Sequence, residues 1–129
     1  MLKTGILNPQ INSLLSRVRH TNLLVIADRG FPYWPGIETV DIALTDDIPR
    51  VLDVLRAIQG NFKIGRYFMA EEFLTASSAA AQMEFSEVMG NAPTVYVPHA
   101  QFKQRVPVAI GLIRTADTTP YSNIILESA

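Results

Sequence analysis

The sequence lacks cysteine and lacks an excess of charge of either sign. Without cysteine there can be no disulfide, no thiolate nucleophile and no Cys-ligated metal site. The 11 Lys and Arg residues are balanced by 12 Asp and Glu residues, which gives a net charge of −1. A nucleic-acid partner is therefore not expected, because binding to phosphates requires a basic surface.

Long hydrophobic runs are also absent. The longest uninterrupted one, Leu23–Ala27, is far shorter than the roughly 20 residues of a membrane span. The first residues, Met1-Leu2-Lys3-Thr4-Gly5, do not have the apolar core of a signal peptide. We therefore expect a cytoplasmic protein with no membrane partner.

Several common site motifs are missing too. There is no glycine-rich phosphate loop, no nucleophile elbow and no paired-histidine metal motif. The sequence therefore predicts no metal and no cofactor. What it does contain is 48% hydrophobic residues in 129, enough for one domain over residues 1–129 with a sizeable core.

Helical and strand patterns alternate along the chain. Helices are predicted at 8–20, 46–60, 71–90 and 98–106, and strands at 23–27, 39–44, 62–70, 94–97, 108–113 and 122–126. The stretch 114–121 is predicted to be a polar loop. This alternation is typical of an α/β fold with a mostly parallel sheet between helix layers.

In such sheets, ligands bind beyond the carboxyl ends of the strands. Asp28 follows the first predicted strand and His99 follows the fourth, so both are candidates for a site. Each also has an ordinary structural interpretation, because aspartate caps turns and His99 follows a proline. His20, the only other histidine, could equally be a helix C-terminal residue that meets free carbonyls.

Tyr121 and Asn123 flank Ser122 at the entry to the last predicted strand. Strand alternation places both side chains on the same face, where they could reach one ligand. Turn chemistry after Pro120 is the alternative. The aromatic residues Phe31, Tyr33 and Trp34 could stack on a ligand or fill a contact between loops or subunits.

At these positions the chain resembles the D-ribose pyranase and L-fucose mutarotase family, more closely its ribose branch. The ordered spacing of many short pieces from Leu7 to Leu126 carries the resemblance. The pieces are Leu7-Asn8, Ser16-Arg17, His20-Thr21, Asp28 with Gly30-Phe31-Pro32, Asp41-Ile42-Ala43-Leu44, Ile48-Pro49, Val54-Leu55, Ala70-Glu71-Glu72, His99-Ala100-Gln101-Phe102-Lys103, Ile113-Arg114-Thr115 and Thr119-Pro120-Tyr121-Ser122-Asn123-Ile124-Ile125-Leu126.

The resemblance implies a three-layer α/β/α sandwich around a mixed, mostly parallel six-stranded sheet. It also implies a homo-oligomeric ring, commonly a decamer, and a cofactor-free isomerase that interconverts ring forms of a monosaccharide such as D-ribose. The family's catalytic histidine falls on His20. Its sugar-binding residues fall on Asp28, His99, Lys103, Tyr121 and Asn123. The resemblance implies that Tyr121 and Asn123 come from a neighbouring subunit.

Two other functions remain open at this point. One is the same chemistry on fucose or on an acidic sugar, since Arg19 and Arg29 stand where the family usually has glycine and a small residue. An arginine facing the site would recognise a carboxylate or phosphate. The other is a non-catalytic sugar-binding ring protein associated with sugar uptake.

Overall fold

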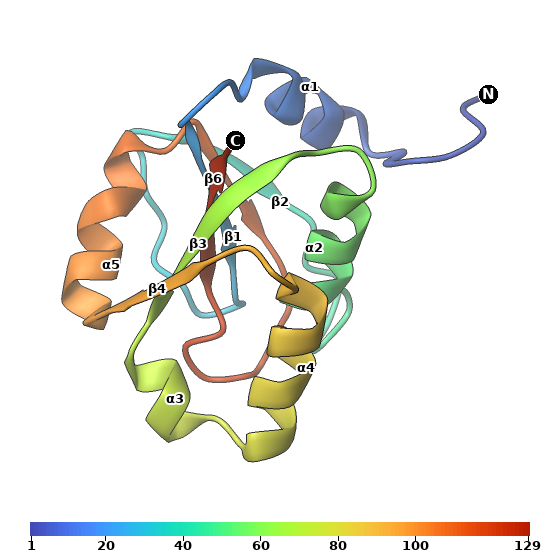
Figure 1. Cartoon of the computed structure of the whole chain (residues 1–129). Coiled ribbons are helices and arrows are strands. Elements are labelled where there is room, and N and C mark those ends of the chain that lie inside the picture. The colour runs from blue at the N-terminus through green and yellow to red at the C-terminus, as the bar shows by residue number, and fades with distance from the viewer.

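The computed structural model describes all of residues 1–129 and contains a six-stranded sheet with helices on both faces (Figure 1). The elements are, in chain order, α1 (Pro9–Arg17), β1 (Leu23–Ala27), β2 (Glu38–Asp41), α2 (Val51–Gln59), β3 (Ile64–Ala70), α3 (Glu72–Ala76), α4 (Ala79–Met89), β4 (Thr94–Val97), α5 (His99–Arg105), a short 3-10 helix (Val106–Val108), β5 (Gly111–Arg114) and β6 (Ile124–Ser128). None of the helices has the length and hydropathy needed to cross a membrane.

Five of the six strands run in one direction and β6 runs against them. The strand order is β2-β5-β1-β6-β3-β4, and β6 pairs antiparallel with both β1 and β3. The carboxyl ends of the parallel strands therefore lie at the same edge of the sheet as the amino end of β6. This mixed sheet confirms the predicted fold class.

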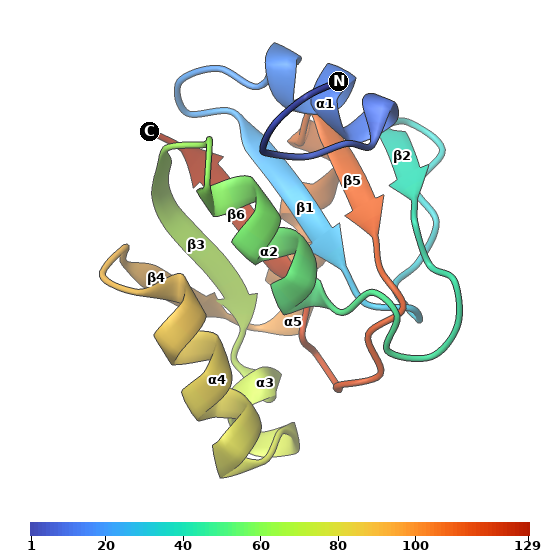
Figure 2. The same ribbon diagram turned by 90° about the vertical axis from the view of Figure 1, so that its right-hand side faces the viewer.

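The two faces of the sheet carry separate hydrophobic cores. Figure 2 shows α2 in front of the sheet and α5 behind it. Leu24 and Ile26 of β1 point into the larger core, which α1, α2, α3 and α4 cover. Val25 and Ala27 point into the smaller core, which Phe102 of α5 helps to close. Every residue of β1 after Leu23 is buried, as expected for a central strand covered on both faces.

The first helix begins where the sequence predicts. Asn8 is its N-cap, and the side-chain oxygen accepts a hydrogen bond from the Ile11 amide at 2.9 Å. Pro9 occupies the first helical position, where its missing N–H has no cost. Ile11 and Leu14 then point from the same face of the helix into the larger core.

Several predicted elements have different bounds from those observed; the second helix, for example, begins at Val51 and not at residue 46. The second strand ends at Asp41, and Leu44 is 78% exposed, because the chain leaves the sheet at its edge. The predicted helix over 71–90 is broken at Ser77-Ser78, where Ser78 is the N-cap of α4. The fifth strand begins only at Gly111, because residues 106–108 form the 3-10 helix.

Gly111 provides a test of how tightly α1 packs on the sheet. A Cβ atom at this position would lie 2.6 Å from Leu14 Cδ1 and 3.1 Å from the Glu38 carbonyl oxygen. Leu14 is fully buried. We expect Gly111→Ala to lower the free energy of unfolding by about 1–3 kcal/mol, the usual cost of overpacking, as measured by urea denaturation.

Gly36→Ala is the matched control, since nothing lies within 4 Å of its added Cβ and its φ is not positive. It should leave stability unchanged or raise it by up to about 1 kcal/mol. Equal effects of the two substitutions would contradict this packing.

Candidate functional site

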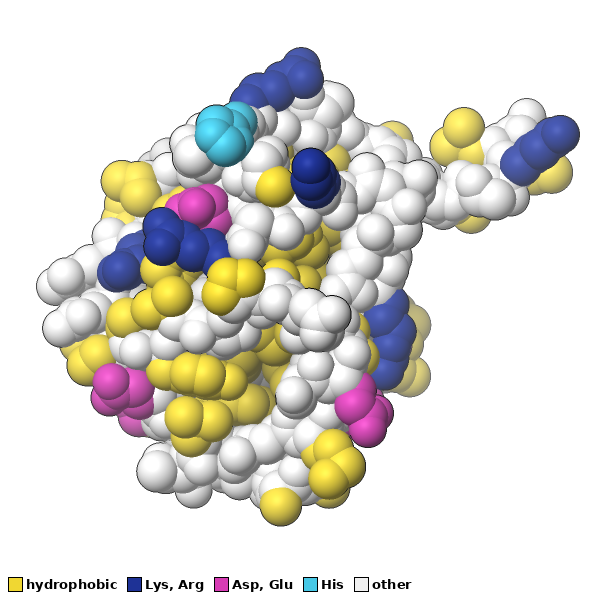
Figure 3. Space-filling view, in the orientation of Figure 1, with side chains coloured by type: hydrophobic (Ala, Val, Ile, Leu, Met, Phe, Trp, Pro, Cys, Tyr) yellow, Lys and Arg dark blue, Asp and Glu magenta, His cyan; other side chains and the backbone are white.

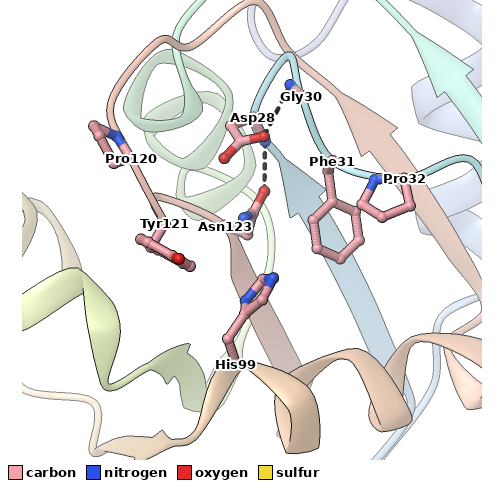
Figure 4. A pocket seen from close by; sticks show the side chains of 8 residues that line it. All are labelled: Asp28, Gly30, Phe31, Pro32, His99, Pro120, Tyr121 and Asn123. Carbon is pink, nitrogen blue, oxygen red and sulfur yellow. Dashed lines mark hydrogen bonds between the residues drawn. The ribbon is translucent and has the colours of Figure 1, made fainter. Parts of the chain in front are cut away.

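A polar pocket lies at the edge of the sheet where β1 and β4 end and β6 begins. Its volume is about 250 Å³, somewhat below the roughly 300–1,000 Å³ of sites for drug-sized ligands, so it suits a small polar molecule. Figure 4 shows the side chains that line it. They are Asp28, Gly30, Phe31, Pro32, His99, Pro120, Tyr121 and Asn123.

Asp28 and Asn123 meet because β6 is antiparallel to β1. Ile26 pairs with Ile124, so the residue after β1 and the residue before β6 are neighbours. The Asp28 amide donates to Asn123 Oδ1 at 2.7 Å, and the Gly30 amide donates to Asp28 Oδ1 at 3.0 Å. The first of these bonds engages the oxygen of the Asn123 amide, which leaves its NH₂ group to donate to the Asp28 carboxylate.

His99 is the first residue of α5 and its ring is enclosed by other aromatic rings. In Figure 4 it extends from the helix between Tyr121 and Phe31, towards Asn123. The ring centroid lies 5.1 Å from that of Tyr121 and 6.3 Å from that of Phe31, both in edge-on geometry. His99 Nδ1 is buried and has no hydrogen-bond partner. Buried polar atoms almost always have a partner, so His99 Nδ1 is a candidate to bind a ligand or a water molecule.

Burial shifts the pKa values of both titratable groups towards their neutral forms. Burial raises the pKa of Asp28, and Asp117 adds to this, while hydrogen bonds from the Gly30 and Phe31 amides and from Asn123 lower it. Burial lowers the pKa of His99, and Lys103 lowers it further, while Glu72 and Asp28 partly offset both effects. For both groups, burial in the pocket thus favours the form without charge.

The structure brings together four of the residues that the sequence singled out, Asp28, His99, Tyr121 and Asn123. Lys103 does not line the pocket. It is four residues after His99 on α5, on the same side of the helix, and close enough for its charge to act on His99. Of the three aromatic candidates, Phe31 lines the pocket, whereas Tyr33 is 70% exposed.

The expectation that Tyr121 and Asn123 come from a neighbouring subunit is wrong. Both line the same pocket as Asp28 of their own chain, and Asn123 is hydrogen-bonded to Asp28. The reversed direction of β6 brings them beside Asp28, whereas the resemblance assigns them to a neighbouring subunit.

His20 lies at the opposite edge of the sheet from this pocket. It precedes β1, whereas Asp28 follows β1, and the intervening strand of five residues spans roughly 17 Å. The amide of the next residue, Thr21, donates to the carbonyl of Ser128, at the far end of β6 from Asn123. His20 is exposed and does not line the pocket of its own chain.

Arg29 points away from the pocket. Its guanidinium contacts Asp46 Oδ1 at 2.7 Å, in an ion pair whose side chains are 58% and 65% exposed. An exposed pair of this kind contributes little to stability. Arg29 therefore provides no charge for recognising an acidic ligand.

Sequence reasoning did not find the arginine that holds the loop after β1. Arg114, at the end of β5, donates from its guanidinium to the carbonyls of Asp28, Arg29 and Pro32, each at 3.3 Å. Its side chain is only 13% exposed. The backbone that carries Asp28 is therefore fixed by a side chain from the neighbouring strand.

Asp117 is a second residue that the sequence did not identify, and it lies in the stretch predicted to be a polar loop. It is buried, and its carboxylate accepts hydrogen bonds from the Val51 amide at 2.9 Å and the Thr119 amide at 2.8 Å. It thereby joins the start of α2 to the loop that carries Tyr121. The only sequence signal is an acidic residue two positions after Thr115. In the structure, the Thr115 hydroxyl accepts a hydrogen bond from the Asp117 amide.

Comparisons with known proteins identify the family of the chain. The profile of the RbsD / FucU transport protein family matches residues 1–129. The chain belongs to this family. Among curated relatives, a D-ribose pyranase from Geobacillus kaustophilus is 38% identical over 128 residues, which cover 99% of this chain and 93% of that protein. One from Coprothermobacter proteolyticus is 36% identical and covers 99% and 97%.

Solved structures of the family have the same fold. Bacillus subtilis RbsD complexed with D-ribose superimposes with a TM-score of 0.91 at 29% identity, covering 100% of this chain and 98% of that one. The fucose mutarotase from Streptococcus pneumoniae in complex with L-fucose gives a TM-score of 0.77 at 17% identity, covering 99% and 98%, and shows the fold alone. No group of three or more His, Asp or Glu side chains in this chain has the arrangement of a metal site.

The raised pKa of Asp28 makes stability depend on pH in a defined direction. Because the folded state binds this proton more tightly than the unfolded state, its stabilising contribution is present at low pH and is lost as pH rises through the folded pKa. We expect the free energy of unfolding of the wild type, relative to Asp28→Asn, to increase from about pH 7 to about pH 4. Urea denaturation across this range measures it, with the exposed Asp46→Asn as the baseline. A constant or decreasing difference would contradict the direction of the shift.

Proposed function

We propose that this protein accelerates the interconversion of ring forms of a monosaccharide such as D-ribose, as a cofactor-free isomerase. One observation carries the proposal: Asp28, His99, Tyr121 and Asn123 converge on one small polar pocket. The similarity to curated D-ribose pyranases over nearly the whole chain supports it. So does the close match to RbsD complexed with D-ribose.

The pocket supplies the groups that hemiacetal opening requires. Opening removes the proton of the anomeric hydroxyl while the ring oxygen gains one; the free aldehyde then recloses on another hydroxyl or through its other face. A neutral His99 imidazole and the Asp28 carboxylate each offer a lone pair to a sugar hydroxyl. Asn123 and Tyr121 add hydrogen-bonding groups for the remaining hydroxyls, which need partners once water is displaced. Because mutarotation is already fast in water, a general acid–base factor of about 10²–10⁴ is sufficient.

We propose that His20 donates the proton to the ring oxygen, and that it does so from a neighbouring subunit. The position of His20 at the far edge of the sheet favours this arrangement, because within one chain β1 separates it from Asp28. A homo-oligomeric ring, with a decamer as the expected form, would bring the two edges of the sheet together. Lys103, beside His99, is proposed to bind a hydroxyl at the edge of the pocket.

Exposed apolar side chains are consistent with such an assembly. Leu44, Val108 and Tyr33 are each 70% exposed or more. Figure 3 shows apolar side chains gathered over the lower centre of one face of the molecule. Surfaces of this kind are commonly covered by another subunit. The number of subunits and a cytoplasmic location remain predictions.

A neutral pentose is the substrate that fits the charges best. The pocket lining includes no Lys or Arg, and Arg29 is paired with Asp46 outside it. An acidic or phosphorylated sugar would therefore place its charge near Asp28 without a cation in the pocket lining to compensate.

The direct test measures ring-form exchange by saturation-transfer NMR on D-ribose, L-fucose and an acidic sugar, with and without the purified protein. We expect accelerated exchange of ribose, and loss of that acceleration in His99→Ala and in His20→Ala. Arg29→Ala should exchange ribose at the wild-type rate, because its partner is on the surface. Ribose binding without any acceleration would instead support the non-catalytic sugar-binding alternative.

Co-assembly of two inactive variants tests whether each site is shared. His20→Ala and Asp28→Asn are expected to be inactive alone. If His20 acts on the pocket of a neighbour, random mixed oligomers should recover about a quarter of the wild-type sites, those that pair an intact His20 with an intact Asp28. Co-expressed variants with different tags, purified in tandem and assayed for exchange, provide the measurement. No recovery in mixed oligomers would place both groups in one chain.

A further inference from the structure

Glu71 and Glu72 belong to one of the short pieces that carry the family resemblance, but neither has a part in the chemistry proposed above. Adjacent residues on a helix do not face each other, so the two cannot act as an acid–base dyad. The structure separates them clearly: Glu71 is exposed, whereas Glu72 is half-buried. Only Glu72 approaches the pocket, through His99.

Glu72 and His99 meet because of the register between β3 and β4. Ala70 and Val97 are paired across these parallel strands, and each strand is followed two residues later by the first residue of a helix. The Glu71 amide donates to the Val97 carbonyl at 2.8 Å, which extends the pairing beyond the strands. The side chain of Glu72 is thereby brought to the start of α5.

Both oxygens of the Glu72 carboxylate accept from the backbone amide of His99, at 3.0 and 3.1 Å. This amide is the first of α5 and has no partner within the helix. Pro98, which precedes it, has no side chain that could accept from it. A charged acceptor on a backbone N–H is among the stronger hydrogen bonds in proteins. The hydrogen bond from the His99 amide to Glu72 holds the backbone of His99, whose ring lies in the pocket.

We propose that Glu72 is a positioning residue for His99: its carboxylate holds the backbone of His99 at the start of α5 and so determines where the imidazole lies in the pocket. This inference rests on the proposed function for its effect on catalysis. Glu72 does not line the pocket and takes no part in proton transfer.

The groups around His99 make the role of Glu72 measurable. Lys103 of its own helix lowers the pKa of His99, whereas Glu72 from α3 and Asp28 from the loop after β1 raise it. The Tyr121 ring, from the loop before β6, packs against the imidazole edge-on. Removing the charge of Glu72 leaves Lys103 opposed by Asp28 alone, so the pKa of His99 should fall further.

The experiment compares the same substitution at two adjacent glutamates. The pKa of His99 is measured by NMR titration of the imidazole protons, with His20 as the only other histidine signal and His20→Ala for assignment. In Glu72→Gln, which retains one oxygen acceptor, the pKa of His99 should fall below the wild-type value. In Glu71→Gln it should move less. This readout needs no catalytic activity, so it tests the contact even if ring-form exchange is not the function.

The second measurement is exchange of D-ribose by Glu72→Ala and Glu71→Ala. Loss of a charge-assisted hydrogen bond and displacement of His99 should lower kcat/KM about tenfold or more in Glu72→Ala, with Glu71→Ala near wild type. If Glu72→Ala does not fold, as judged by circular dichroism, the pKa of His99 in Glu72→Gln still tests the contact. An unchanged pKa of His99 in Glu72→Gln, or equal losses of activity at positions 71 and 72, would overturn the proposal.

Discussion

The antiparallel insertion of β6 between β1 and β3 is the constraint on which the site depends. In an all-parallel sheet, the residue before a strand lies at the edge opposite to the residues that follow its neighbours. Reversing one central strand brings Asn123 beside Asp28. A hydrogen bond of 2.7 Å from the Asp28 amide to Asn123 Oδ1 joins the end of β1 to the start of β6. The polar groups of the pocket thus come from segments far apart in the sequence, although their side chains lie close together.

A second consequence of this arrangement is electrostatic. The pocket lies at the ends of two largely buried strands, and burial of its titratable groups favours their neutral forms. Backbone amides and the Asn123 side chain partly stabilise the Asp28 carboxylate, and Glu72 partly stabilises a protonated His99. The protein therefore does not pair these groups with strong opposite charges.

The sequence predicts the layers of the fold and much of the site, but not how the strands are ordered. The apolar run Leu23–Ala27 and the Asn8-Pro9 cap are local signals, and both match the structure. The direction of β6 depends on long-range pairing that alternation of residues does not encode, so the sequence does not show that Asn123 lies beside Asp28 of the same chain. Asp117 lies in a loop, as predicted, but the sequence does not show that it is buried. Burial of a carboxylate requires partners, here the Val51 and Thr119 amides, that only the folded chain brings to it.

The three hydrogen bonds from Arg114 to the loop after β1 have a consequence for how this surface can change. All three are accepted by backbone carbonyls, so they do not depend on which side chains the loop carries. Arg29 points outwards from this segment, where it pairs with Asp46, and can vary without moving Asp28. The outer surface of the loop can therefore diverge between relatives, or be redesigned, while the inner surface keeps its geometry. Substitutions on the outer surface of the loop therefore need not change the geometry of the pocket.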